Sequence, residues 1–137
     1  MKAVLFFLSL VIFATASCSS GDDLVAAERE VAKFRQSYEA EAFEAIYDQG
    51  ADELRKVQSK QAFATLLEAI KRKLGDVTNT KLVSSNVNYS AGGTVVTLQY
   101  ATVFEHGKGS ERFVFRLAGK KALLGGYTVN SADLLIR

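Results

Sequence analysis

The chain has 137 residues, of which 48% are hydrophobic, and a formal net charge of +2, which suits one domain with a single core. So small a charge excludes the strong positive field of a nucleic-acid-binding protein, and we expect no nucleic acid among its partners. One cysteine and one histidine exclude an internal disulfide and the usual zinc ligand sets, so we predict neither a metal nor another cofactor.

The first 17 residues have the three-part pattern of an export signal. Lys2 provides the positive start, residues 3–13 form an apolar run, and residues 14–17 are small. A run of 11 residues is too short for a transmembrane helix, which needs about 20. We therefore predict a signal peptide over residues 1–17 and not a membrane-spanning anchor.

Cys18 follows this segment, and the sequence Thr-Ala-Ser-Cys over residues 15–18 resembles the lipobox of bacterial lipoproteins. The resemblance implies cleavage before Cys18, diacylglycerol on its thiol, a fatty acid such as palmitate on the new amino terminus, and attachment to a membrane. Ser19 is not Asp, which implies the periplasmic face of the outer membrane in enterobacteria-like sorting. Because Thr15 replaces the usual leucine and residues 14–16 also fit A-x-A cleavage, a free periplasmic or secreted protein is the alternative.

A first helical pattern follows a polar, lipidated tether that we predict over residues 18–23, ahead of a single domain over residues 24–137. Apolar side chains recur every three or four residues from Leu24, which is the spacing of one helical face. The register shifts near Phe43, so we expect the helix to bend or restart there and to end at Gly50.

A second helical pattern begins after Ser59, a favourable N-cap, and ends at Gly75. Between the two patterns, residues 51–58 are expected to form a loop or one short helical turn. The predicted apolar stripe of the second helix consists of Phe63, Leu66, Leu67, Ile70 and Leu74.

After Gly75 the pattern changes to the alternation of β-strands. Four strands are predicted over residues 78–89, 94–104, 111–117 and 123–131, with turns over residues 90–93, 106–109 and 119–120. Such short turns can only join antiparallel neighbours. The predicted fold class is α+β, with two or three N-terminal helices packed on one face of a four-stranded antiparallel meander.

Two groups of side chains are candidates for binding. The candidate pocket-lining residues are Tyr38, Tyr100, Phe115 and Tyr127. They could surround a small apolar ligand between the helices and the sheet, although ordinary core packing is the alternative. Arg112 and Arg116, on the opposite face, are candidate anion contacts, against the alternative of charges that are only solvated.

The residues supply no catalytic constellation. Nucleophilic catalysis needs a base beside the nucleophile, and the one histidine, His106, lies between turn residues. We therefore predict a non-catalytic, membrane-anchored binding module whose partner is an envelope protein. The alternative is a binder of a small apolar ligand, or an enzyme, that uses the pocket.

Several core and turn segments carry a resemblance to a bacterial family. They are Leu74-Gly75-Asp76-Val77, residues 95–104 centred on Tyr100, Glu111, and Gly125-Gly126-Tyr127. Over about residues 28–131 the chain resembles domain-of-unknown-function family 4019, whose members are exported or lipid-anchored. The resemblance implies a cystatin-like or nuclear-transport-factor-2-like roll and no agreed activity. The family tends to have a tryptophan ahead of the final Gly-Tyr pair, and this chain has none.

Overall fold

The computed structural model describes residues 20–135, so the predicted signal peptide and Cys18 lie outside the described residues. The elements in chain order are α1 (Ser20–Glu39), α2 (Phe43–Asp48), α3 (Asp52–Val57), α4 (Lys60–Leu74), β1 (Val77–Ser90), β2 (Gly93–Phe104), β3 (Gly107–Ala118), β4 (Lys121–Asn130) and a short 3-10 helix, η1 (Ala132–Leu134). None of the described helices has the length and apolar character needed to cross a membrane.

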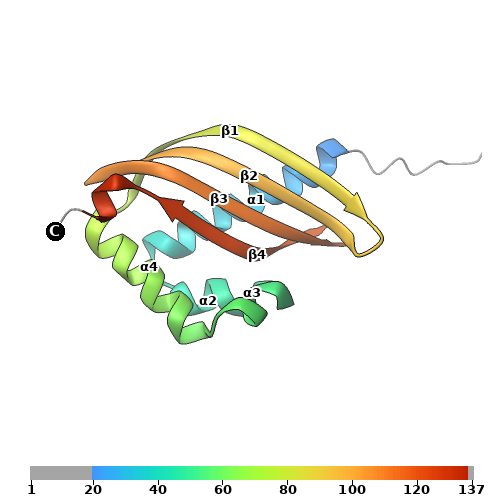
Figure 1. The fold of residues 1–137 in the computed structure, drawn as a ribbon, viewed down its shortest axis with the longest axis horizontal. Helices are drawn as coiled ribbons and strands as arrows, with labels where there is room; N and C mark the ends of the chain where they lie inside the picture. Colours follow the sequence, from blue (N-terminus) through green and yellow to red (C-terminus); the bar gives the residue numbers. More distant parts are fainter. Residues whose placement is uncertain (1–19, 136–137) are drawn as a thin grey trace, which may run out of the picture.

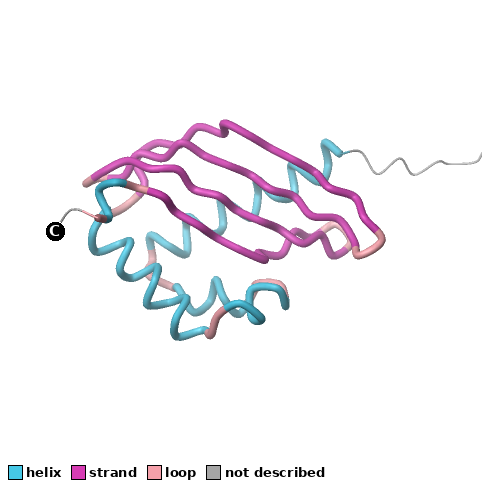
Figure 2. The backbone as a smooth tube through the Cα atoms, viewed as in Figure 1, coloured by secondary structure: helices cyan, strands magenta, loops and turns pink. Residues whose placement is uncertain are grey.

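The four strands form one sheet in the order β1-β2-β3-β4, and each strand pairs antiparallel with the next (Figure 1). Helix α1 runs along one face of the sheet, and the three shorter helices form a second group at the β4 side of that face (Figure 2). The predicted α+β class and antiparallel meander are confirmed.

Helix α1 begins at Ser20, four residues before the expected start. Residues 20–23, which we had assigned to the tether, therefore belong to the helix. The reason is that Asp22 and Asp23 lie in the first turn, where carboxylates interact favourably with the positive end of the helix dipole. The part of the chain between Cys18 and the domain is correspondingly shorter than expected.

The expected restart near Phe43 is confirmed, because α1 and α2 are separate helices. Glu41 adopts a positive φ of 57°, and the Ala42 amide donates to the Ser37 carbonyl at 2.8 Å, the pattern of a helix that ends in a left-handed residue. This turn gives the chain a new direction, so α2 and α4 can pack together beside the sheet.

The cap and stop predicted for α4 are confirmed. Ser59 Oγ accepts a hydrogen bond from the Ala62 amide at 3.2 Å, and Gly75 has a φ of 75°. Leu66, which we placed in the buried stripe, is 40% exposed, because it lies on the side of α4 that faces away from the core. The segment ahead of Ser59 forms α3, a helix of six residues.

The turn predicted over residues 106–109 is wrong, because strand β3 already begins at Gly107. Phe104 pairs with Gly107, so the loop is only Glu105 and His106. The glycines make room for the C-terminal segment instead. A Cβ on Gly107 would lie 2.7 Å from the Asp133 carboxylate, and one on Gly109 would lie 2.6 Å from the Asn130 carbonyl oxygen.

The hydrophobic core lies between α1, α2, α4 and the inner face of the sheet. Phe34 of α1 is at its centre, with ring centroids 5.0 Å from Phe113 and 4.8 Å from Tyr127. These contacts hold α1 against β3 and β4, and they position one charged side chain of α1 over the interior.

Candidate functional site

A buried carboxylate lies in the middle of the interior. Glu111 of β3 is 1% exposed, and its Oε2 accepts hydrogen bonds from Arg35 Nη2 at 2.8 Å and from Thr102 Oγ1 at 2.5 Å. Its Oε1 accepts a hydrogen bond from the Tyr127 hydroxyl at 2.7 Å. We call Arg35, Thr102, Glu111 and Tyr127 the Glu111 cluster.

The Glu111 cluster joins four elements, because its members come from α1, β2, β3 and β4. Strand alternation turns Glu111 to the same side as Phe113, and Thr102 to the same side as Tyr100. A carboxylate fixed by three donors is a strong structural link, since removing any partner leaves a buried polar group unpaired.

The Arg35 guanidinium is stacked inside the fold as well as paired. Its central carbon lies 5.5 Å from the Tyr100 ring centroid and 5.6 Å from the Phe113 ring centroid, which is cation–π distance. Arg35 Nη1 is buried and has no hydrogen-bond partner among the described residues. The ion pair and the two rings stabilise this partly buried charge.

Burial and the nearby Glu111 carboxylate together raise the pKa of Tyr127 well above its ordinary value. The pKa of Tyr38 is raised by burial first and by Glu111 second. Both phenols therefore stay protonated at neutral pH, and each acts as a hydrogen-bond donor.

The four candidate pocket-lining residues all lie in the core, at 8% exposure or less. Tyr38 contacts Phe34 and Phe43 and donates its hydroxyl to the Gly75 carbonyl at 3.0 Å. Tyr100 and Phe115 pack against Phe113. These side chains fill the space between helices and sheet, the place where a small apolar ligand and ordinary core packing were the two interpretations.

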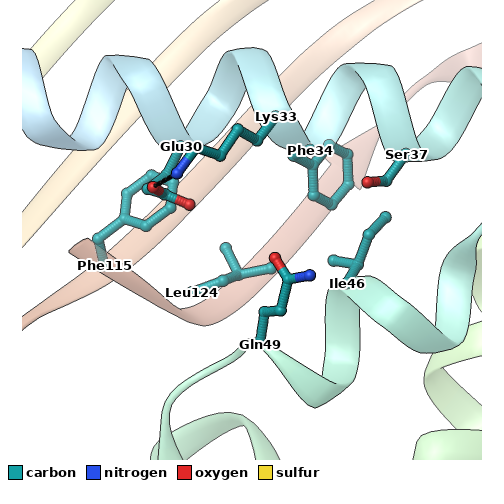
Figure 3. A pocket seen from close by; sticks show the side chains of 8 residues that line it. All are labelled: Glu30, Lys33, Phe34, Ser37, Ile46, Gln49, Phe115 and Leu124. Atoms are coloured by element: carbon teal, nitrogen blue, oxygen red, sulfur yellow. Dashed lines mark hydrogen bonds and ion pairs between the residues drawn. The ribbon is translucent and has the colours of Figure 1, made fainter. Parts of the chain in front are cut away.

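A crevice opens between α1, α2 and the sheet, and Phe115 is the candidate residue that lines it (Figure 3). Its mouth is polar, with the Glu30–Lys33 ion pair of 2.6 Å on α1 and the Gln49 amide opposite. The cavity volume is about 30 Å³, which holds one or two water molecules. Pockets for small ligands are about ten times larger.

The two candidate anion contacts differ in their surroundings. Arg112 is exposed, whereas Arg116 donates to Glu53 Oε1 at 2.8 Å and to the Gly92 carbonyl at 3.0 Å. A hydrogen bond from its own amide, and then Arg116, hold the pKa of Glu53 below its usual range. Arg116 thus links α3 to the sheet, and Arg112 is the more available of the two.

The sheet has one open edge and one covered edge. At the covered edge, the Ala51 amide ahead of α3 donates to the Leu124 carbonyl of β4 at 2.8 Å. Strand β1 forms the opposite edge over 14 residues, none of them buried. Leu82 and Val83 are exposed there, at 36% and 53%, beside a bulge between Leu82 and Ser84. We call this strand the β1 edge.

Other chemistry-bearing residues are dispersed over the described part of the chain. His106 is exposed in the β2–β3 loop. Within residues 20–135, no three His, Cys, Asp or Glu side chains are grouped so that they could hold a metal ion. Cys18, the candidate lipid attachment site, lies outside these residues.

Sequence reasoning missed Arg35 and Thr102, and it used Glu111 only as part of a resemblance. A signal was present, because Glu111 occupies an inward position of β3 and Arg35 adjoins Phe34 on the apolar face of α1. A charge on each of two facing apolar surfaces predicts an ion pair between them.

The comparisons with known proteins give one result. The sequence model of a family described as "Protein of unknown function (DUF4019)" matches residues 30–127. The match includes all four members of the Glu111 cluster and excludes the N-terminal segment with Cys18. No curated protein matches the chain.

Proposed function

The chain belongs to the DUF4019 family, whose function is unknown, and we propose that it is an envelope lipoprotein that acts as a non-catalytic binding module. Support for the anchor comes from the export-signal pattern and from Cys18 behind it. Lipid on this cysteine would hold the domain on a membrane, and the outer membrane is the site that Ser19 favours.

The observation that carries the binding role is the β1 edge. An unpaired strand edge offers a row of backbone donors and acceptors to which an extended segment of another protein can add as a further strand. The side chains of Leu82 and Val83 lie exposed beside this row and give it apolar contacts. We therefore propose that the partner is an envelope protein that contributes an extended peptide segment.

The interior supports this proposal more than the pocket alternative. Its aromatic side chains contact one another, and the hydroxyls of Tyr38 and Tyr127 donate to groups of the fold. A small apolar ligand, or a substrate, would have to displace these side chains from the core.

Intact mass and membrane partitioning of the mature protein from cells test the anchor. We expect a mass that includes lipid and a protein in the membrane fraction, both lost in Cys18→Ala. Ser19→Ala, next to the cleavage site, is the matched control and should keep both. A lipid-free mature mass would refute the anchor and make the protein a free periplasmic or secreted one.

Photo-crosslinking in cells tests the binding surface, with a reactive amino acid at position 83 or 103. Val83 and Val103 are both exposed valines of the sheet, at 53% and 44%, but only Val83 lies on the β1 edge. We expect a discrete adduct from position 83 and none from position 103. In a separate affinity-capture assay without the reactive amino acid, Val83→Lys should lower capture of that partner by about tenfold, equal to 1.4 kcal/mol, and Val103→Lys should not. Equal effects at both positions would refute the proposal that the β1 edge is the binding surface.

A further inference from the structure

One end of the domain gathers the start of α1 and two hairpin tips (Figure 1). The Tyr89 hydroxyl beside the β1–β2 turn donates to Asp23 Oδ2 at 2.9 Å. Lys120 of the β3–β4 turn lines a surface hollow together with Arg29 and the first turns of α1. We call this the α1 end. The β2–β3 loop and η1 lie at the other end of the sheet.

The α1 end is the part of the domain closest in sequence to Cys18. Ser20, the first described residue, is two positions after it, so the two Cα atoms can be at most about 7 Å apart in any conformation. The helical start of α1 removes the slack that a six-residue tether would have given. A lipid on Cys18 would therefore bring the α1 end, and not the opposite end, to the membrane surface.

The charges of the α1 end suit this position. Arg29, Lys120 and Lys121 are exposed, and lysines near an anionic lipid surface are attracted to it. Asp22 and Asp23 lie at the same end, and the hydrogen bond from the neutral Tyr89 hydroxyl leaves the Asp23 charge in place, so the three cations exceed these two carboxylates by one charge. Val25, which is 54% exposed beside these groups, adds an apolar side chain that can enter the head-group region.

We propose that the α1 end lies against the membrane, with Lys120, Lys121 and Arg29 in contact with lipid phosphates. The proposal rests on the lipid anchor proposed above. The strands then stand away from the membrane, and a strand of 12 residues reaches about 40 Å. The β1 edge runs along this height, and its part beyond the α1 end faces a partner in the periplasm.

The absence of tryptophan from the chain permits a direct test with single fluorescent reporters. Lipidated, mature protein carrying Val25→Trp or Val103→Trp is placed in vesicles of phosphatidylethanolamine and brominated phosphatidylglycerol. Both positions are exposed valines, but Val103 lies near the β2–β3 loop. We expect quenching of the Val25→Trp reporter to exceed that of the Val103→Trp reporter several-fold. Equal quenching, or none at either position, would overturn the orientation.

Two further measurements separate the possible failures. Lys120→Glu with Lys121→Glu in the Val25→Trp background should lower the quenching, whereas Lys108→Glu near the other end should not; no change with the first pair would overturn the phosphate contacts. Intact mass is recorded for every sample. A protein without lipid refutes the anchor itself, whereas a lipidated protein whose two reporters are equally quenched refutes the orientation alone.

Discussion

At the scale of single residues, the Glu111 carboxylate is the side chain on which the most buried polar groups depend. Glu111→Ala would leave the Arg35 charge and the Thr102 and Tyr127 hydroxyls without their acceptor in the core. We expect a loss of about 3–5 kcal/mol in the free energy of unfolding, measured by urea denaturation. Glu111→Gln keeps the shape and some acceptor capacity, so it should lose less.

The comparison for this prediction is Glu30→Ala. Glu30 also forms an ion pair, with Lys33 at 2.6 Å, but at the surface and within one helix, so its loss should change stability by less than about 1 kcal/mol. The double substitution Arg35→Met with Glu111→Leu should be milder than Glu111→Ala, because it leaves no unpaired charge. Equal losses for Glu111→Ala and Glu30→Ala would contradict the central role of the cluster.

The buried tyrosines predict a loss of stability in alkali. Burial raises the pKa of Tyr38, Tyr100 and Tyr127, and the Glu111 charge adds to each rise. The unfolded chain therefore releases these protons first as the pH rises. The contribution of these tyrosines to the free energy of unfolding is fully present below about pH 10. Above that pH it falls by about 1.4 kcal/mol per pH unit for each tyrosine. Urea denaturation from pH 8 to 11 measures the slope of the free energy of unfolding against pH. Tyr127→Phe should reduce this slope by the amount that one proton contributes; an unchanged slope would disprove the contribution of Tyr127.

At the scale of elements, the turn between α1 and α2 stores strain at one residue. Glu41 has a positive φ of 57°, which glycine adopts without the steric cost that a side chain incurs. We expect Glu41→Gly to raise the free energy of unfolding by about 1 kcal/mol. Glu39→Gly, at the last residue of α1, should instead lower it by a similar amount. A loss of stability in both variants would show that the turn does not require the left-handed conformation.

The helices and strands also show which features of the fold local sequence patterns can predict. The stripe of α4 and the alternation of β2 predict helix and strand because one face of each element is buried. A local sequence pattern fails where a residue is required by its contact with a distant part of the chain. Gly107 and Gly109 look like turn residues, but they admit Asp133 and Asn130, which follow more than 20 residues later.

The dependence on distant contacts also explains why the sequence did not reveal the filled interior or the ion pair between Arg35 and Glu111. Tyr38, Tyr100, Phe115 and Tyr127 were correctly placed on inward faces, but the sequence pattern gives no measure of how much space remains between those faces. Packing decides that point, and here Phe34 and Phe113 occupy the centre. The pairing of Arg35 with Glu111, 76 positions apart, required the fold to bring α1 onto β3.

At the scale of the whole molecule, the β1 edge must accept a partner without joining two copies of the chain. Lys81 is the only charged residue of β1, and a lysine on an edge strand opposes pairing with another edge. Lys81→Val should therefore cause concentration-dependent association, measured by sedimentation at micromolar concentrations. Lys108→Val, on the interior strand β3, should leave the protein in the same state as the unmodified chain. If both variants sediment like the unmodified chain, the bulge at Val83 is the feature that protects the edge, and the charge of Lys81 is dispensable.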